Sequence, residues 1–222
     1  MTPGPPPLEA VLFDMDGTLV DSEGLWRRAE RELAAAFGVT LEPARQATFE
    51  GKEVPAIARV LRETYGLPIN VQDLERALND RVLALLPEAL EAPGAGELVA
   101  WAAARKLRRA VVSNSPRHVV EATLAPHPWA ASLPRRYAAG EGVRAKPAPD
   151  LYLQAAQGLG VVPAACVVLE DSPTGAAAAL AAGMRCLAVP SSAHAKAGMA
   201  ALGLEPLAGL EEALEGLRAW IV

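Results

Sequence analysis

Residues 11–20 read Val-Leu-Phe-Asp-Met-Asp-Gly-Thr-Leu-Val (VLFDMDGTLV), and this stretch decides the fold. Three apolar residues lead directly into two acids that are separated by a single residue. Like charges at this spacing are costly unless a partner neutralises them. The stretch therefore predicts a buried strand whose end delivers Asp14 and Asp16 to a site with a neutralising partner.

Further apolar segments alternate with helical segments along the rest of the chain. Strands without an alternating polar face are typical of a parallel sheet that helices cover on both faces. The sequence therefore predicts an α/β fold with a Rossmann-like parallel sheet. The expected strands are 9–14, 108–114, 135–140, 165–171 and 185–190, and the expected helices are 96–107, 116–125, 148–160, 172–184 and 208–220.

The segment after the first strand has a different pattern, with helices expected at 22–37, 43–49, 53–64 and 71–86 and no strand between 22 and 91. We interpret residues 22–91 as a small helical cap inserted into a core of residues 1–21 and 92–222. Residues 1–7 are expected to form a loose tail. One side of the first cap helix is predicted to carry its apolar residues, namely Leu25, Trp26, Ala29, Leu33 and Phe37.

Composition excludes several classes of protein. The net charge of -5 argues against a binder of nucleic acid or of anionic membranes, since both need a basic face. No apolar run approaches the ~18 residues of a membrane helix, and no signal peptide is apparent. Cys166 and Cys186 lie in apolar runs, which favours buried free thiols. We expect a cytoplasmic monomer or weak homodimer.

Polar side chains follow several of the predicted strands, at the edge where an open parallel sheet binds its ligands. Each short motif could be only a turn or a helix cap. Their joint occurrence at strand ends, or beside one, instead favours an active site. The residues concerned are Asp14, Asp16, Ser113, Asn114, Lys146, Glu170 and Asp171.

The chemistry of this set suits phosphoryl transfer. Carboxylates from two strands provide the oxygen ligands that Mg²⁺ prefers, and leave room for phosphate oxygens. A lysine, a hydroxyl and an amide add donors for a phosphoryl group. An aspartate that faces a metal-bound phosphate can act as the nucleophile, because this reaction depends mainly on positioning and on charge neutralisation.

The chain resembles the haloacid dehalogenase superfamily of phosphotransferases, in the subgroup with a helical cap inserted after the first motif. The resemblance covers nearly the whole chain. Its motifs are FDMDGTLVDSE (13–23), PGAGELV (93–99), VVSNS (111–115), KPAPDLY (146–152) and LEDSPTGAAAALAAGM (169–184).

The resemblance implies a catalytic role for both acids of the first motif. Asp14 would be the nucleophile and a Mg²⁺ ligand. Asp16 would bind the metal through its main-chain carbonyl, protonate the leaving oxygen and then activate water. Asp171 would be a further metal ligand, with Glu170 beside it either as a ligand or as a supporting group.

The resemblance also implies how the phosphate is held. Ser113, with help from Asn114, would bind the transferring phosphoryl group. Lys146 would balance the charges of the nucleophile and the phosphate. The dehalogenase branch lacks the second aspartate, so the presence of Asp16 disfavours dehalogenation.

The cap motif DSEGLW (21–26) resembles capped hexose-phosphate and hexitol-phosphate phosphatases. The β-phosphoglucomutase branch typically has a histidine where this chain has Trp26, and a GVSR-like loop where this chain reads Gly51-Lys52-Glu53-Val54. Both departures disfavour a mutase. Trp26 either belongs to the cap core or faces the site, and Lys52 either reaches the substrate or is solvated.

These observations favour a Mg²⁺-dependent phosphatase that acts on small phosphorylated metabolites, such as sugar or polyol phosphates, through an aspartyl-phosphate. A β-phosphoglucomutase-like phosphosugar mutase is the alternative within the same chemistry. A non-catalytic phosphate-binding regulatory protein is the alternative of another class, although it has no need for both Asp14 and Asp16. A dinucleotide oxidoreductase is disfavoured, because no G-x-G-x-x-G follows the first strand.

Overall fold

The computed structural model describes residues 6–220, so most of the predicted N-terminal tail lies outside the described residues. Its centre is a five-stranded sheet in the order β5-β4-β1-β6-β7, and every pairing in this sheet is parallel. The predicted α/β fold is therefore confirmed. The strands are β1 (Ala10–Phe13), β4 (Arg108–Pro116), β5 (Arg136–Ala139), β6 (Cys166–Glu170) and β7 (Arg185–Ala188).

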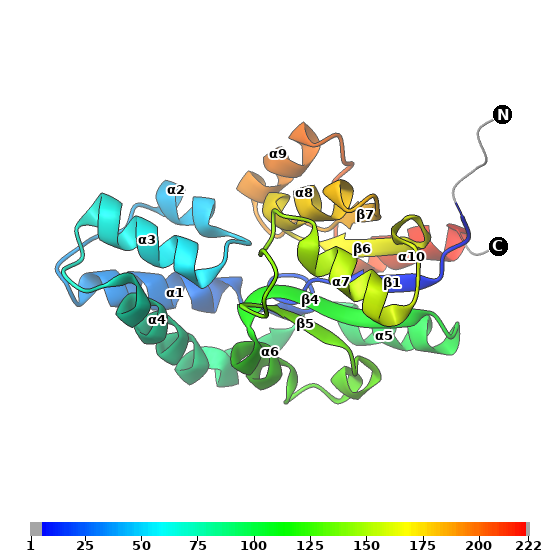
Figure 1. Ribbon diagram of the computed structural model, residues 1–222, viewed down its shortest axis with the longest axis horizontal. Coiled ribbons are helices and arrows are strands. Elements are labelled where there is room, and N and C mark those ends of the chain that lie inside the picture. Colours follow the sequence, from blue (N-terminus) through cyan, green and yellow to red (C-terminus); the bar gives the residue numbers. More distant parts are fainter. Residues whose placement is uncertain (1–5, 221–222) are drawn as a thin grey trace.

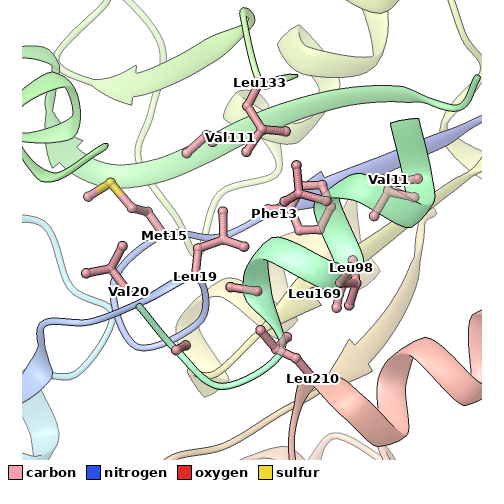
Figure 2. Close-up of a cluster of buried hydrophobic side chains, with 14 of the residues drawn as sticks. Val11, Phe13, Met15, Leu19, Val20, Leu98, Val111, Leu133, Leu169 and Leu210 are labelled. Atoms are coloured by element: carbon pink, nitrogen blue, oxygen red, sulfur yellow. The ribbon is translucent and has the colours of Figure 1, made fainter. Parts of the chain in front are cut away.

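Strand β1 lies in the middle of the sheet and is buried on both faces. Its alternate residues enter two separate apolar clusters, as expected for a two-residue repeat along a strand. Val11 and Phe13 pack in one cluster with residues of α5 (Ala95–Ala104) and α10 (Leu210–Trp220), while Leu12 packs in the other with residues of α7 (Asp150–Leu159) and α8 (Pro173–Ala181). Figure 2 shows the first cluster, with Phe13 between the sheet and the flanking helices.

The helices outside the cap cover both faces of the sheet, which explains why these strands are apolar throughout. The loop from Ser191 leads into α9, which packs against α8. These helices are α5 (Ala95–Ala104), α6 (Arg117–Leu124), α7 (Asp150–Leu159), α8 (Pro173–Ala181), α9 (Ala193–Ala201) and α10 (Leu210–Trp220), with 3₁₀ turns at Pro128–Ser132 and Pro163–Ala165.

The inserted helices form a cap at one end of the molecule, at the left in Figure 1. They pack around an apolar cluster of their own, which includes Leu33, Leu61 and Leu78. The cap helices are α1 (Glu23–Ala35), α2 (Pro43–Gln46), α3 (Val54–Tyr65) and α4 (Val71–Leu85), with 3₁₀ turns at Ala47–Phe49 and Leu86–Glu88.

Three sequence-based expectations need correction. The two connections to the cap pair as short antiparallel strands, β2 (Val20–Asp21) and β3 (Leu90–Glu91), although no strand was expected between 22 and 91. Helix α9 was not predicted, because its alanine-rich sequence lacks a clear apolar period. Phe37 is 36% exposed, since α1 ends at Ala35 and no longer directs it into the cap.

Both cysteines are free, but only Cys166 is buried, and Cys186 is half-buried. None of the helices described for residues 6–220 combines the length and the apolar character needed to cross a bilayer.

The central position of Phe13 gives a first prediction. Phe13→Ala should lower the free energy of unfolding by about 3–5 kcal/mol, because it leaves a cavity beneath the middle strand. Phe37→Ala is the matched control and should change it by less than about 1 kcal/mol. Urea unfolding of both variants measures the difference, and equal losses would contradict the assigned core.

Candidate active site

Three neighbouring strands bring polar side chains to one edge of the sheet. Strand β1 lies between β4 and β6, and Phe13 is level with Val111 and Leu169. Asp14 follows immediately, and its main-chain N–H donates to the carbonyl of Leu169 at 3.0 Å. The predicted site residues of these strands therefore meet at the carboxyl edge, as expected for an open parallel sheet.

Lys146 is the buried cation of this edge. Its Nζ lies 2.7 Å from Asp14 Oδ1 and 2.6 Å from Glu170 Oε1, and donates to the carbonyl of Val112 at 2.7 Å. Burial alone would lower the pKa of Lys146, but the charges of Asp14 and Glu170 outweigh burial and raise it. Lys146 is therefore charged throughout the physiological range.

Glu170 is held by protein donors at both carboxylate oxygens. Oε1 accepts from Lys146 and from the Tyr152 hydroxyl at 2.8 Å, while Oε2 accepts from the N–H and the hydroxyl of Ser172 at 3.2 and 3.0 Å. Burial and Glu170 raise the pKa of Tyr152, so this hydroxyl stays a neutral donor. This arrangement makes Glu170 a support for Lys146 rather than a free ligand.

A buried acidic group lies beside the lysine. Ligand oxygens of Asp14, Glu170 and Asp171 lie within 4.8 Å of one another. Burial raises the pKa of Asp14 and of Asp171 well above the usual range, and neighbouring carboxylates raise it further. One lysine does not neutralise three acids, and an all-oxygen set suits Mg²⁺. The residues present therefore fit a divalent cation, which Asp14 and Asp171 could hold.

Asp16 lies beside Asp14, on the side that faces the cap. Its Oδ1 accepts from the Ser22 hydroxyl at 2.6 Å and from the indole N–H of Trp26 at 3.1 Å. Its Oδ2 accepts from the hydroxyls of Ser115 at 2.7 Å and Ser113 at 3.4 Å. The side chain of Asp16 is thus fixed by donors from both the cap and the core, and its predicted metal contact through the main-chain carbonyl stays a prediction.

Trp26 fulfils both interpretations of its role. It is 8% exposed and belongs to the apolar cluster of the cap, and its indole N–H reaches Asp16. The sequence alone could not decide between the two, because the ring and the N–H of one indole can face different surroundings.

Asn114 connects the lysine loop with the cap. Its Nδ2 donates to the carbonyls of Lys146 and Gly51 at 3.0 and 2.9 Å, and its Oδ1 accepts from the Lys146 N–H at 2.9 Å. Both amide hydrogens therefore have protein partners in this conformation, and Asn114 positions Lys146. Its predicted contact with a phosphoryl group stays a prediction.

The cap loop closes onto the core at Glu50 and Gly51. Glu50 accepts from the Ser192 hydroxyl at 2.8 Å and pairs with Arg27 at 2.9 Å. Gly51 has a φ of +71°, and a Cβ there would lie 2.6 Å from the Cβ of Ser172, so only glycine allows this approach. Lys52 is exposed at the rim of the same loop.

A pocket of about 540 Å³, including its open mouth, lies between the cap and the sheet edge. This volume is in the range of small-ligand sites. Asp14, Asp16, Ser113, Asn114 and Lys146 line the pocket from the core. These five predicted residues therefore share one pocket with the cap, whereas Glu170 and Asp171 lie outside its lining.

Sequence reasoning missed the polar residues that line this pocket from the cap. They are Glu23, Arg27, Glu30, Gln46 and Glu50. On α1, Glu23, Trp26, Arg27 and Glu30 follow the i, i+3, i+4, i+7 spacing of a single helix face. That spacing was a usable signal, but charged helix residues are normally interpreted as solvated.

Glu30 gives a prediction on stability. Burial raises its pKa from 4.5 to about 7, although the hydrogen bond from Gln46 opposes the shift. A carboxyl with a raised pKa in the folded state contributes fully below its unfolded pKa, and this contribution is lost as pH rises through the folded value. Glu30 therefore destabilises the protein increasingly between about pH 4.5 and 7.

Glu30→Gln removes this titration and should stabilise the protein at pH 8 by up to about 3 kcal/mol, with little gain at pH 4.5. Glu63→Gln, on the exposed face of α3, is the control and should show no such dependence. Urea unfolding at both pH values measures the effect. A gain that does not vary with pH would contradict it.

Comparisons with known proteins identify the family of this chain. A family model for haloacid dehalogenase-like hydrolases matches residues 8–183. Protein CbbY of Cereibacter sphaeroides is 41% identical over 82% of this chain and 84% of its own length. Hexitol phosphatase B of Escherichia coli (strain K12) is 34% identical over 82% of this chain and 83% of its own.

A crystal structure of a CbbY variant from Rhodobacter sphaeroides, in complex with xylulose-(1,5)bisphosphate, is also similar. It is 34% identical, covers 83% of this chain and 87% of the other, and gives a TM-score of 0.75. The sheet, the acids at its carboxyl edge and these matches lead to one conclusion: the chain belongs to the haloacid dehalogenase-like hydrolases and is an enzyme of the phosphatase type.

Proposed function

We propose that the chain is a Mg²⁺-dependent phosphatase of small sugar or polyol phosphates that works through an aspartyl-phosphate on Asp14. The observation that carries the proposal is the position of Asp14, between the charged Lys146 at 2.7 Å and the acidic group with Asp171. The names of its relatives support the substrate class, since hexitol phosphatase B is one of them.

Asp14 has one oxygen free for attack. Oδ1 is tied to Lys146, whereas Oδ2 accepts no hydrogen bond among the residues that the structure describes. In the first step an oxygen of Asp14 forms a bond to phosphorus, and the bond from phosphorus to the leaving oxygen breaks. Mg²⁺, when bound, would neutralise phosphate oxygens and reduce their repulsion of the attacking carboxylate.

Asp16 would transfer the protons in both steps. When protonated, it would donate to the leaving oxygen and become a carboxylate. That carboxylate would then take a proton from water, whose oxygen attacks phosphorus and releases Asp14. Ser113 lies beside Asp16 and would bind the transferring group, while Lys146 would offset its negative charge.

We also propose the division of labour within the chain. Residues 22–91 would act as the cap that selects the substrate, and residues 1–21 and 92–222 as the core that performs the chemistry. Lys146 would remain in place when the cap moves, because its loop is held by Asn114 from the core. The cytoplasmic location and the monomeric or weakly dimeric state stay predictions.

Asp14→Asn should reduce Mg²⁺-dependent phosphate release by at least about a thousandfold, because it removes the nucleophile. Asp21→Asn, an exposed change nearby on the chain, should retain full activity. A phosphate-release assay over a panel of sugar and polyol phosphates, with and without a chelator, measures both. Unimpaired turnover by Asp14→Asn would contradict the proposal. Conversion of β-glucose 1-phosphate to the 6-phosphate without phosphate release would favour the mutase.

Trp26→Phe tests the contact between the cap and Asp16. The indole N–H can only donate, so it would hold the Asp16 carboxylate in position while that group takes a proton from water. Phenylalanine keeps the apolar packing and should lower kcat about three- to tenfold. Trp101→Phe, in α5 and outside the lining of the pocket, should leave kcat unchanged. Equal kcat values in the two variants would exclude this role of the indole.

A further inference from the structure

Helix α1 presents a largely polar face to the pocket, although an apolar face would be easier to bury. Glu23, Trp26, Arg27 and Glu30 all line it, one turn after another. Residues at this spacing lie on one side of a helix. The face therefore borders the space that the leaving part of a substrate would occupy, opposite Asp14.

Glu30 is the most deeply buried acid of this face. It is 2% exposed, and its Oε2 accepts from the Gln46 amide at 2.9 Å. This is the single hydrogen bond that the Glu30 carboxylate accepts within residues 6–220. The same Gln46 amide also donates to the main-chain carbonyl of Arg27 at 2.9 Å, so its orientation is fixed. Glu30 thus keeps an acceptor oxygen for a ligand, held by a neighbour that cannot turn freely.

The charges around Glu30 do not neutralise it. Burial outweighs the charges of Arg27 and Arg31, which lower the pKa of Glu30. Arg27 is itself bound by Glu50 at 2.9 Å. Glu30 forms no ion pair among the described residues, and Glu23 lines the same pocket. Burial raises the pKa of Glu23 well above the usual range, and Asp16 and Glu50 raise it further. The inner part of the pocket is therefore acidic, and Lys52 lies exposed at its rim.

A buried carboxylate without a counter-ion is unfavourable for folding, as the raised pKa of Glu30 also indicates. Packing of α1 does not require it, since a leucine or glutamine would fill a similar volume. Strongly perturbed groups in a cleft are candidates for functional roles. Trp26 contacts Asp16 at the sheet edge, and Glu30 lies one helical turn further along α1. Glu30 is therefore too far along the helix for the reacting edge, and recognition of a ligand is the role that its position favours.

We propose that Glu30, oriented by Gln46, determines specificity by accepting hydrogen bonds from hydroxyl groups of the substrate away from the transferred phosphate. The residue selects monophosphates with an uncharged, polyhydroxylated carbon chain. It disfavours substrates that carry a second phosphate or a carboxylate at that position. This inference rests on the proposed function and names the substrate class of the same pocket.

The physical reason for this selectivity is that a hydroxyl group can donate a hydrogen bond to Glu30, whereas a second anion cannot. A hydroxyl donates to a carboxylate in a charge-assisted hydrogen bond, which is stronger than a neutral one. A second anion has no proton to donate and would be desolvated beside Glu30 and Glu23. Sites that hydrogen-bond a hydroxyl reject analogues without it far more strongly than apolar pockets reject a missing methylene.

The test compares two substrates of equal chain length. Sorbitol 6-phosphate ends in a hydroxymethyl group and 6-phosphogluconate in a carboxylate. The ratio of their kcat/KM values should favour sorbitol 6-phosphate in the wild type by at least about tenfold, and Glu30→Gln should lower this ratio at least about fivefold. Glu32→Gln, exposed on the same helix, is the control and should keep the wild-type ratio.

A second variant guards against a folding defect. Gln46→Met removes the donors that orient Glu30 and should lower the same ratio about threefold or more. A wild type without preference, or a ratio unchanged in both variants, overturns the inference while phosphate release still supports the proposed function. Absence of Mg²⁺-dependent release from both substrates and from p-nitrophenyl phosphate would overturn the proposed function and the inference together.

Discussion

The contact of Lys146 with Asp14 and Glu170 is the interaction on which the rest of the site depends. A parallel sheet that is buried on both faces has only its carboxyl edge for polar chemistry, and here that edge carries several acids. One buried cation holds two of them at 2.7 and 2.6 Å. The remaining negative charge leaves an acidic edge whose carboxylate oxygens fit a divalent cation.

The sequence was sufficient for the core of this site, and the reason is geometric. Asp14, Lys146 and Asp171 lie next to strands whose apolar pattern and order follow from local rules. Parallel strands end at the same edge, so residues that are 132 positions apart, such as Asp14 and Lys146, could be placed together in advance. Residues that directly follow parallel strands can be placed together in this way, because the order of the strands fixes their neighbours.

The cap side could not be predicted, because its contacts depend on how separate helices pack. In the sequence Glu30 has the features of a solvated helix residue, and only the packing of Gln46 of α2 against it shows that it is buried. Glu50 meets Ser192, which is 142 positions away, across a loop with no recognisable pattern. Asn114 was expected as a donor to phosphate, which stays a prediction, and nothing in the sequence indicated that its hydrogens also bind the carbonyls of Lys146 and Gly51. Long-range polar pairing leaves little trace in local sequence.

Glycine at position 175 has a consequence for how this enzyme tolerates change. It lies within α8, where alanine usually stabilises a helix by about 1 kcal/mol relative to glycine. A Cβ at Gly175, however, would collide with the carboxylate of Glu170. The smallest possible enlargement would displace Glu170 and, through it, the lysine that faces the nucleophile. A residue with no side chain thus limits the size of its position, and an alanine that helix propensity alone would favour here forces the Glu170 carboxylate to move.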